Sequence, residues 1–179
     1  MSAHRVPCVL VLVLSLVFAL APAAHAQDST KSAPPPKPCS APEHRQFDFW
    51  IGNWNVTTPD GKPAGSSRIE SIAGSCALLE NWSGSAGGNG KSLNYYSPKD
   101  GKWHQTWVGS GGSFLLLEGG LEDGKMVLTG TNPTAAGGTR IERITWTPLP
   151  DGRVQQHWQQ SNDGGKTWTD AFVGIYAKK

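Results

Sequence analysis

The sequence predicts an all-β protein, a closed antiparallel barrel of eight to ten strands in up-and-down order. Turn signals recur along the chain, and the short segments between them alternate polar with apolar residues. Asp-Gly favours tight hairpin turns because glycine accepts a positive φ and aspartate hydrogen-bonds its own backbone. The pair occurs five times, at Asp60-Gly61, Asp100-Gly101, Asp123-Gly124, Asp151-Gly152 and Asp163-Gly164.

The segments between the turns are predicted strands. Alternation is clearest at 102–108 and 153–159. Only 42–50 could form a short helical turn, and no later segment supports a long helix. Closure into a barrel removes exposed sheet edges, and a β-sandwich is the alternative. The expected strands are 49–58, 65–73, 76–83, 90–97, 102–109, 113–119, 124–131, 139–147, 152–160 and 167–177.

Residues 1–26 predict a secretory signal peptide. His4 and Arg5 precede an apolar run at 8–21, and the small residues at 24–26 suit cleavage after Ala26. An uncleaved anchor is the alternative, but the run is about 14 residues, short of the roughly 20 that cross a bilayer. We expect an exported protein, periplasmic or extracellular, without a membrane span after cleavage.

Two further regions follow the predicted signal peptide. Residues 27–38 are polar and then proline-rich, which predicts a disordered tether, and residues 39–179 are long enough for one domain. The chain has 16 Lys and Arg against 14 Asp and Glu. Without Arg5 the net charge is about +1 and the charges are scattered, so neither nucleic acid nor an anionic membrane is indicated as a partner. We expect a monomer.

Two of the three cysteines, Cys39 and Cys76, follow the predicted cleavage site. An exported protein meets an oxidising compartment, so we predict that they form a disulfide. The bridge would close a loop of about 37 residues and contribute on the order of 4 kcal/mol. Free redox-active thiols are the alternative, but these normally form a closer Cys-x-x-Cys pair.

Five stretches resemble a group of exported bacterial proteins designated DUF1579-like, related to the calycin superfamily of lipocalins, fatty-acid-binding proteins and nitrobindins. The resemblance implies a calycin-like barrel in which Gly52-Asn53-Trp54 opens the first strand and Trp54 plugs the closed end. It also implies a basic residue over Trp54, for which Lys178 and Lys179 are candidates. The stretches are EHRQFDFWIGNWNV at 43–56, CALLENW at 76–82, GKSLNYYSP at 90–98, WHQTWV at 103–108 and FVGIYAKK at 172–179.

The chain departs from this group at three positions. Acidic residues are common in the group where this chain has Asn53, Asn55 and Gly109. If an acid at any of these positions carries proton transfer in the group, this chain has lost it.

The eight tryptophans alternate with amides and other polar residues at period two. Such a face suits a cavity for a partly polar small molecule, because the rings offer stacking planes and the amides orient polar groups. A barrel core filled by tryptophan is the alternative. The candidate ligand-binding residues are Glu80, Trp82, Asn94, Tyr96, Gln105, Trp107, Arg143, Gln156 and Trp158.

Sites for cofactors and metals are not indicated. His104 and His157 alternate with the inward-facing residues, so both should face outward, which disfavours haem and zinc. The segment 161–168 resembles an Asp-box, which we interpret as a structural turn. No Gly-x-Ser-x-Gly occurs in the context that a serine nucleophile needs.

We therefore expect an exported barrel protein that binds a small, partly apolar molecule in its interior without covalent chemistry. One alternative is a small hydrolytic or isomerising enzyme, with Glu80 or Glu70 as the acid-base group and Arg143 as the anion partner. Another is a structural or interaction module of the cell envelope. A barrel interior filled by side chains, with no pocket above about 300 Å³, would count against binding. An acid that converges with Arg143 on one cavity would favour the enzyme.

Overall fold

The computed structural model describes residues 37–179. The predicted signal peptide at 1–26 and most of the tether at 27–38 lie outside the described residues. Within residues 37–179, no helix has the length and apolar character that crossing a membrane requires.

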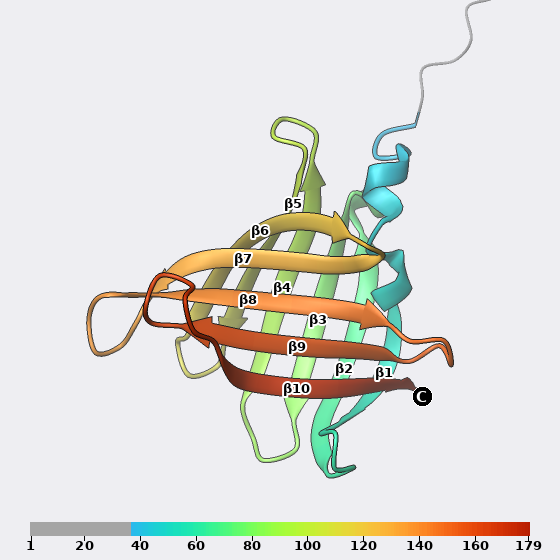
Figure 1. Ribbon diagram of the computed structural model, residues 1–179. Coiled ribbons are helices and arrows are strands. Elements are labelled where there is room, and N and C mark those ends of the chain that lie inside the picture. The colour runs from blue at the N-terminus through green and yellow to red at the C-terminus, as the bar shows by residue number, and fades with distance from the viewer. Residues whose placement is uncertain (1–36) are drawn as a thin grey trace, which may run out of the picture. The chain divides into compact units, whose positions relative to one another are not determined.

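All ten strands form one closed antiparallel sheet, in which each strand pairs with the next along the chain and β10 pairs with β1 (Figure 1). The predicted barrel is confirmed, and the sandwich alternative is wrong because the sheet closes on itself. Every predicted strand is present. The strands are β1 Gly52–Thr57, β2 Pro63–Ile72, β3 Ala77–Gly84, β4 Asn89–Ser97, β5 Lys102–Gly109, β6 Phe114–Glu122, β7 Lys125–Pro133, β8 Thr139–Pro148, β9 Val154–Ser161 and β10 Thr169–Lys178.

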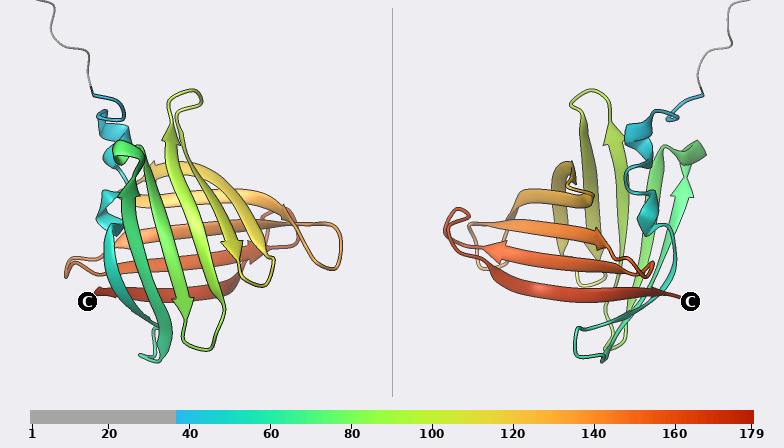
Figure 2. Two further views of the ribbon diagram at one scale, coloured as in Figure 1. Left: turned by 180° about the vertical axis from the view of Figure 1, so that it is seen from behind. Right: turned by 45° about the vertical axis from the view of Figure 1, so that its right-hand side comes forward.

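The barrel has two crossing halves. Strands β1 to β5 run along one direction, and β6 to β10 run across them, as both views of Figure 2 show. The five Asp-Gly pairs lie at hairpins as predicted. Their glycines have φ of +84, +71, +78, +82 and +74, for Gly61, Gly101, Gly124, Gly152 and Gly164 respectively.

The helical turn predicted at 42–50 is present as two short 3-10 segments, η1 Pro42–Arg45 and η2 Asp48–Trp50. A third, η3 Ala73–Ser75, connects β2 to β3 and was not expected. The first two segments cover one end of the barrel, where the indole Nε1 of Trp103 donates to the carbonyl of Glu43 over 3.1 Å.

Five large aromatic side chains fill the barrel at this covered end. We call them the aromatic plug. Phe47 lies at the centre, with its ring 4.9 Å from that of Trp50, 5.1 Å from Trp146 and 5.6 Å from Trp103. Each member is at most 2% exposed, so this end of the barrel is closed. The members are Phe47, Trp50, Trp54, Trp103 and Trp146.

The Gly-x-Trp motif joins the plug to the last strand. The Nζ of Lys178 lies 4.6 Å from the centre of the Trp54 ring and donates to the carbonyl of Ile51 over 2.9 Å. Gly52 has φ of +146, and a Cβ there would lie 2.9 Å from Nζ of Lys178. Glycine therefore leaves room for the lysine that closes β10 onto the entrance of β1.

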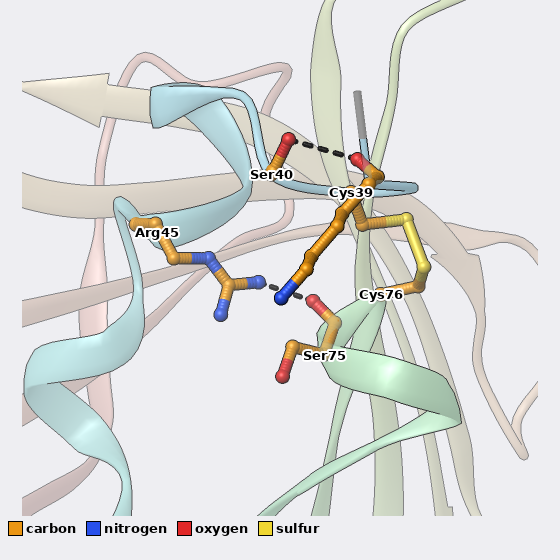
Figure 3. The surroundings of a disulfide bond; sticks show 6 residues. Cys39, Ser40, Arg45, Ser75 and Cys76 are labelled. Atoms are coloured by element: carbon orange, nitrogen blue, oxygen red, sulfur yellow. Dashed lines mark hydrogen bonds between the residues drawn. A yellow bond between two sulfur atoms is a disulfide. The ribbon is translucent and has the colours of Figure 1, made fainter. Parts of the chain in front are cut away.

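The predicted Cys39–Cys76 disulfide is present and ties the segment before η1 to the start of β3 (Figure 3). Beside it, the guanidinium of Arg45 donates to the carbonyl of Ser75. The bridge and this hydrogen bond hold the covering segment against the barrel.

Candidate functional site

A cavity of about 240 Å³, partly open to solvent, lies at the end of the barrel opposite the plug. Strand β5 spans both ends, because Trp103 near its start belongs to the plug and Trp107 near its end lines the cavity. The volume is below about 300 Å³, the size under which we expected a pocket to count against binding. At about 30 Å³ per water it has room for roughly eight waters, which restricts any ligand to a small molecule.

Six of the nine candidate binding residues line this cavity. Five further wall residues were not among the candidates: Leu115 on β6, Ile144 on β8, and Ala171, Phe172 and Tyr176 on β10. Both groups face inward from several strands, so the cavity belongs to the barrel interior. The six are Glu80, Trp82, Gln105, Trp107, Gln156 and Trp158.

Glu80, on β3, places a carboxyl in the cavity wall and is 5% exposed. Its Oε1 accepts a hydrogen bond from Ser67 on β2 over 3.0 Å, and its Oε2 accepts one from Ser92 on β4 over 2.9 Å. Burial raises the pKa of Glu80 from its ordinary value of 4.5 to about 7, although both hydroxyls favour the ionised form. The carboxyl is therefore poised to gain or lose a proton near neutral pH.

A chain of side-chain hydrogen bonds leads to Glu80 from two strands away. Nε2 of Gln105 donates to Oδ1 of Asn94 over 2.7 Å, and Nδ2 of Asn94 donates to Oγ of Ser92 over 2.9 Å. Asn94 is fully buried behind the wall, so it orients Gln105 without lining the cavity. With its Nε2 engaged, Gln105 keeps Oε1 as an acceptor for the cavity.

Three aromatic rings of the wall lie directly over glycines, two of them on a neighbouring strand and one, Gly174, on the same strand as its ring. A Cβ at Gly65 would come within 2.9 Å of the Trp82 ring, and one at Gly174 within 2.6 Å of the Phe172 ring. A Cβ at Gly90 would come within 2.1 Å of the ring of Trp107. Only glycine leaves the rings this close to the sheet, so the cavity depends on these positions.

The wall opposite Glu80 is also held by hydrogen bonds. The Tyr176 hydroxyl donates to Oε1 of Gln156. Burial, and after it the charge of Glu80, raises the pKa of Tyr176 well above its ordinary value. Nε1 of Trp158 donates to Oε2 of Glu142 over 2.6 Å. Glu142 is 1% exposed, and Arg140 Nε donates to its other oxygen over 2.8 Å.

Two of the three remaining candidates lie elsewhere. Nη2 of Arg143 donates to Gln159 over 2.7 Å, and the guanidinium lies 3.9 Å from the centre of the Trp168 ring, on the outer face. Tyr96 faces inward but lies toward the plug, with its ring 5.1 Å from that of His44.

Glu70, the other acid considered for catalysis, also lies on the outer face. It accepts hydrogen bonds from Arg68 over 2.8 Å and from Asn81 over 3.1 Å. Neither Glu70 nor Arg143 reaches the cavity, so the acid-arginine pair expected of an enzyme does not form there.

Both mid-strand histidines lie on the outer face, His104 bonded to Asp100 over 2.9 Å and His157 to Asp170 over 2.7 Å. The ligand atoms of Asp100, His104 and Glu118 lie within 4.8 Å of one another, a cluster that the sequence analysis missed. It arises because His104 and Glu118 are register partners in β5 and β6. Lys102 also pairs with Glu118, which already balances that charge.

The Asp-box-like segment forms a hairpin turn between β9 and β10. Asp163 accepts hydrogen bonds from the Thr167 hydroxyl over 2.6 Å, the Thr167 amide over 2.9 Å and the Lys166 amide over 3.0 Å. These bonds, led by that of the Thr167 hydroxyl, lower the pKa of Asp163 to about 2. The Asp163 carboxylate therefore stabilises the hairpin turn.

Fold and site together define a closed antiparallel barrel with one plugged end and one small aromatic cavity that contains a carboxyl group. A scan against protein-family models finds no match to the chain, and a search of curated proteins finds none.

Proposed function

We propose that this protein is exported and binds a small, partly apolar molecule in the cavity, without covalent chemistry. The observation that carries the proposal is the cavity in the barrel interior, which has aromatic walls and polar groups already held in place. Preformed pockets of this composition are typical of small-molecule sites. Its modest volume makes the ligand smaller than those of most such sites.

Two further features support the cellular location and the family relationship that we propose. The Cys39–Cys76 disulfide is compatible with an oxidising compartment. Lys178 lies over Trp54 at the closed end, which is the arrangement implied by the resemblance to calycins. We therefore include a periplasmic or extracellular location and a calycin-like relationship in the proposal.

An enzyme is the second candidate, because a carboxyl group with a pKa of about 7 suits general acid-base catalysis. Any such chemistry would rest on Glu80 with the neutral groups of Tyr176 and Gln156. Comparison of substrate turnover by the wild type and by the Glu80→Gln variant distinguishes an enzyme from a binding protein, since a binding protein releases its ligand unchanged.

Ligand-observed NMR with a set of small aromatic fragments tests the binding proposal. The Ala171→Trp variant fills the cavity wall at an exposed position, and Thr169→Trp adds the same side chain on β10 away from the cavity. We expect fragments that bind the wild type and Thr169→Trp but lose binding to Ala171→Trp. Fragment signals that Ala171→Trp leaves unchanged, or no binding at all, would contradict the proposal.

A further inference from the structure

We propose that the cavity selects a small organic cation, an ammonium group with apolar substituents, which the Glu80 carboxylate holds among aromatic rings. This inference rests on the proposed binding function and names the chemical class of its ligand.

The charge of the cavity wall points to a cation. Glu80 is its one carboxyl group, and among residues 37–179 the wall includes no Lys, Arg or His. Ser67 and Ser92, which face the carboxylate from β2 and β4, are neutral, and Tyr176 faces it from β10 as a neutral phenol. An ionised Glu80 thus lacks a counter-charge inside the cavity, which a cationic ligand would supply.

The second buried carboxyl near the cavity is already paired, so the preference rests on Glu80. Glu142, on β8, lies behind Trp158 and is bonded to its indole nitrogen. Arg140 pairs with Glu142 but is itself about a third exposed and lies outside the cavity wall. An anionic ligand would approach Glu80 without meeting any opposite charge on the wall.

The hydrogen bonds of Glu80 leave room for a ligand. A carboxylate has about four acceptor positions, and the two serines use two of them. The Oε1 atom of Gln105 is a further acceptor on the same wall. The wall therefore offers acceptors to a donor group or to a positive charge.

Aromatic faces surround this acidic group. Trp82, Trp107, Trp158 and Phe172 line the cavity from four strands. A cation over the face of a tryptophan gains electrostatic attraction from the ring, and partial desolvation increases the gain. Rings and carboxylate together match an ammonium group with methyl or benzyl substituents.

This arrangement makes binding compete with a proton. Because burial raises the pKa of Glu80 to about 7, the carboxyl is largely protonated below that pH and must release its proton to pair with a cation. Affinity for a cation whose own charge does not change with pH should be constant above about pH 7. Well below pH 7 this affinity should fall about tenfold per pH unit. Affinity for an uncharged molecule should not follow this profile.

Calorimetric titration with benzyltrimethylammonium and its uncharged isostere neopentylbenzene tests the inference. The two probes share shape and apolar surface and differ in one charge. We expect the wild type at about pH 8 to bind the cation more tightly than the isostere, and Glu80→Gln to bind the cation roughly ten- to a hundredfold more weakly. Affinity for neopentylbenzene should be unchanged in Glu80→Gln.

Glu70→Gln is the matched control, because Glu70 lies on the outer face near β3 and outside the cavity. Its affinity for both probes should equal that of the wild type. The pH profile of the wild type gives a second readout that does not depend on the folding of a variant.

Equal affinity for the two probes, or cation binding that neither Glu80→Gln nor acid weakens, would overturn the inference. Cavity binding as such would then still stand if fragments bind and Ala171→Trp blocks them. No binding of the cation while neutral fragments bind would also overturn it.

Discussion

The two ends of the barrel use the same residue type for different purposes. Trp103 and Trp107 lie on one face of β5, yet the first is 2% exposed inside the plug and the second is partly buried in the cavity wall. The plug is covered by η1 and η2, which the disulfide ties to the barrel. At the open end, glycines beneath the rings provide the space, and no segment of residues 37–179 fills it.

The difference shows that alternation along a strand predicts which face a side chain occupies but not its depth along the barrel. Whether a tryptophan fills a core or lines a cavity depends on what covers that end. Core filling by tryptophan therefore describes the covered end, while tryptophans line a cavity at the open end, where ligand binding stays a prediction.

Truncation on β5 should show the largest contrast between the ends. Trp103→Ala should lower the free energy of unfolding by about 3–5 kcal/mol, because it removes a buried ring from the plug. Trp107→Ala should cost less than half of this and should weaken binding of benzyltrimethylammonium. Urea denaturation and calorimetry measure the two effects. Equal losses of stability would contradict the division of the barrel into a structural end and a proposed binding end.

Removal of the disulfide should affect the closed end selectively. The double variant Cys39→Ser, Cys76→Ser should lose about 2–4 kcal/mol of stability, since the bridge closes a separation of 37 residues. Hydrogen exchange should rise at residues 42–50 and stay unchanged at Trp82 and Trp107. Increased exchange at the cavity would show that the two ends are coupled.

Glu80 should make stability depend on pH. A carboxyl group whose pKa rises on folding stabilises the folded state fully below its unfolded pKa of 4.5. This stabilisation is lost as the pH rises to the folded pKa of about 7. The Glu80→Gln variant lacks this loss, so its stability relative to the wild type should increase by about 3 kcal/mol between about pH 4 and pH 8. Chemical denaturation across this range measures the change, and a constant difference would contradict the raised pKa.

A single methyl group should give the smallest effect on stability. Gly90→Ala places a Cβ 2.1 Å from the Trp107 ring, so the ring must move, at a cost of about 1 kcal/mol or more. Binding should weaken as the wall shifts. Gly120→Ala on β6 is the matched control, because nothing lies within 4 Å of its Cβ. If the two variants behave alike, the ring does not depend on the glycine.

Much of the fold follows from local signals in the sequence. Asp-Gly pairs and alternation are properties of short segments, so all ten strands could be predicted, with ends displaced by a few residues. The pairing of Cys39 with Cys76 followed from their number and the expected compartment.

The site was harder to predict, because it depends on register between strands. On β8, apolar Ile141 and Ile144 are three residues apart, so alternation does not decide the inward face, and Arg143 is outside while Glu142 is buried. Tyr96 has the expected face but lies nearer the closed end. The buried Glu142 is an acidic residue at an inward position, which only its hydrogen bonds with Trp158 and Arg140 explain.

The most direct measurement is the NMR titration of the Glu80 side-chain carboxyl, with and without saturating benzyltrimethylammonium. The account predicts a pKa near 7 in the free protein, because burial opposes ionisation. It predicts a decrease of at least about one unit with the cation bound, because an adjacent positive charge favours the carboxylate. A pKa near 4.5 in the free protein, or one that the cation leaves unchanged, would contradict it.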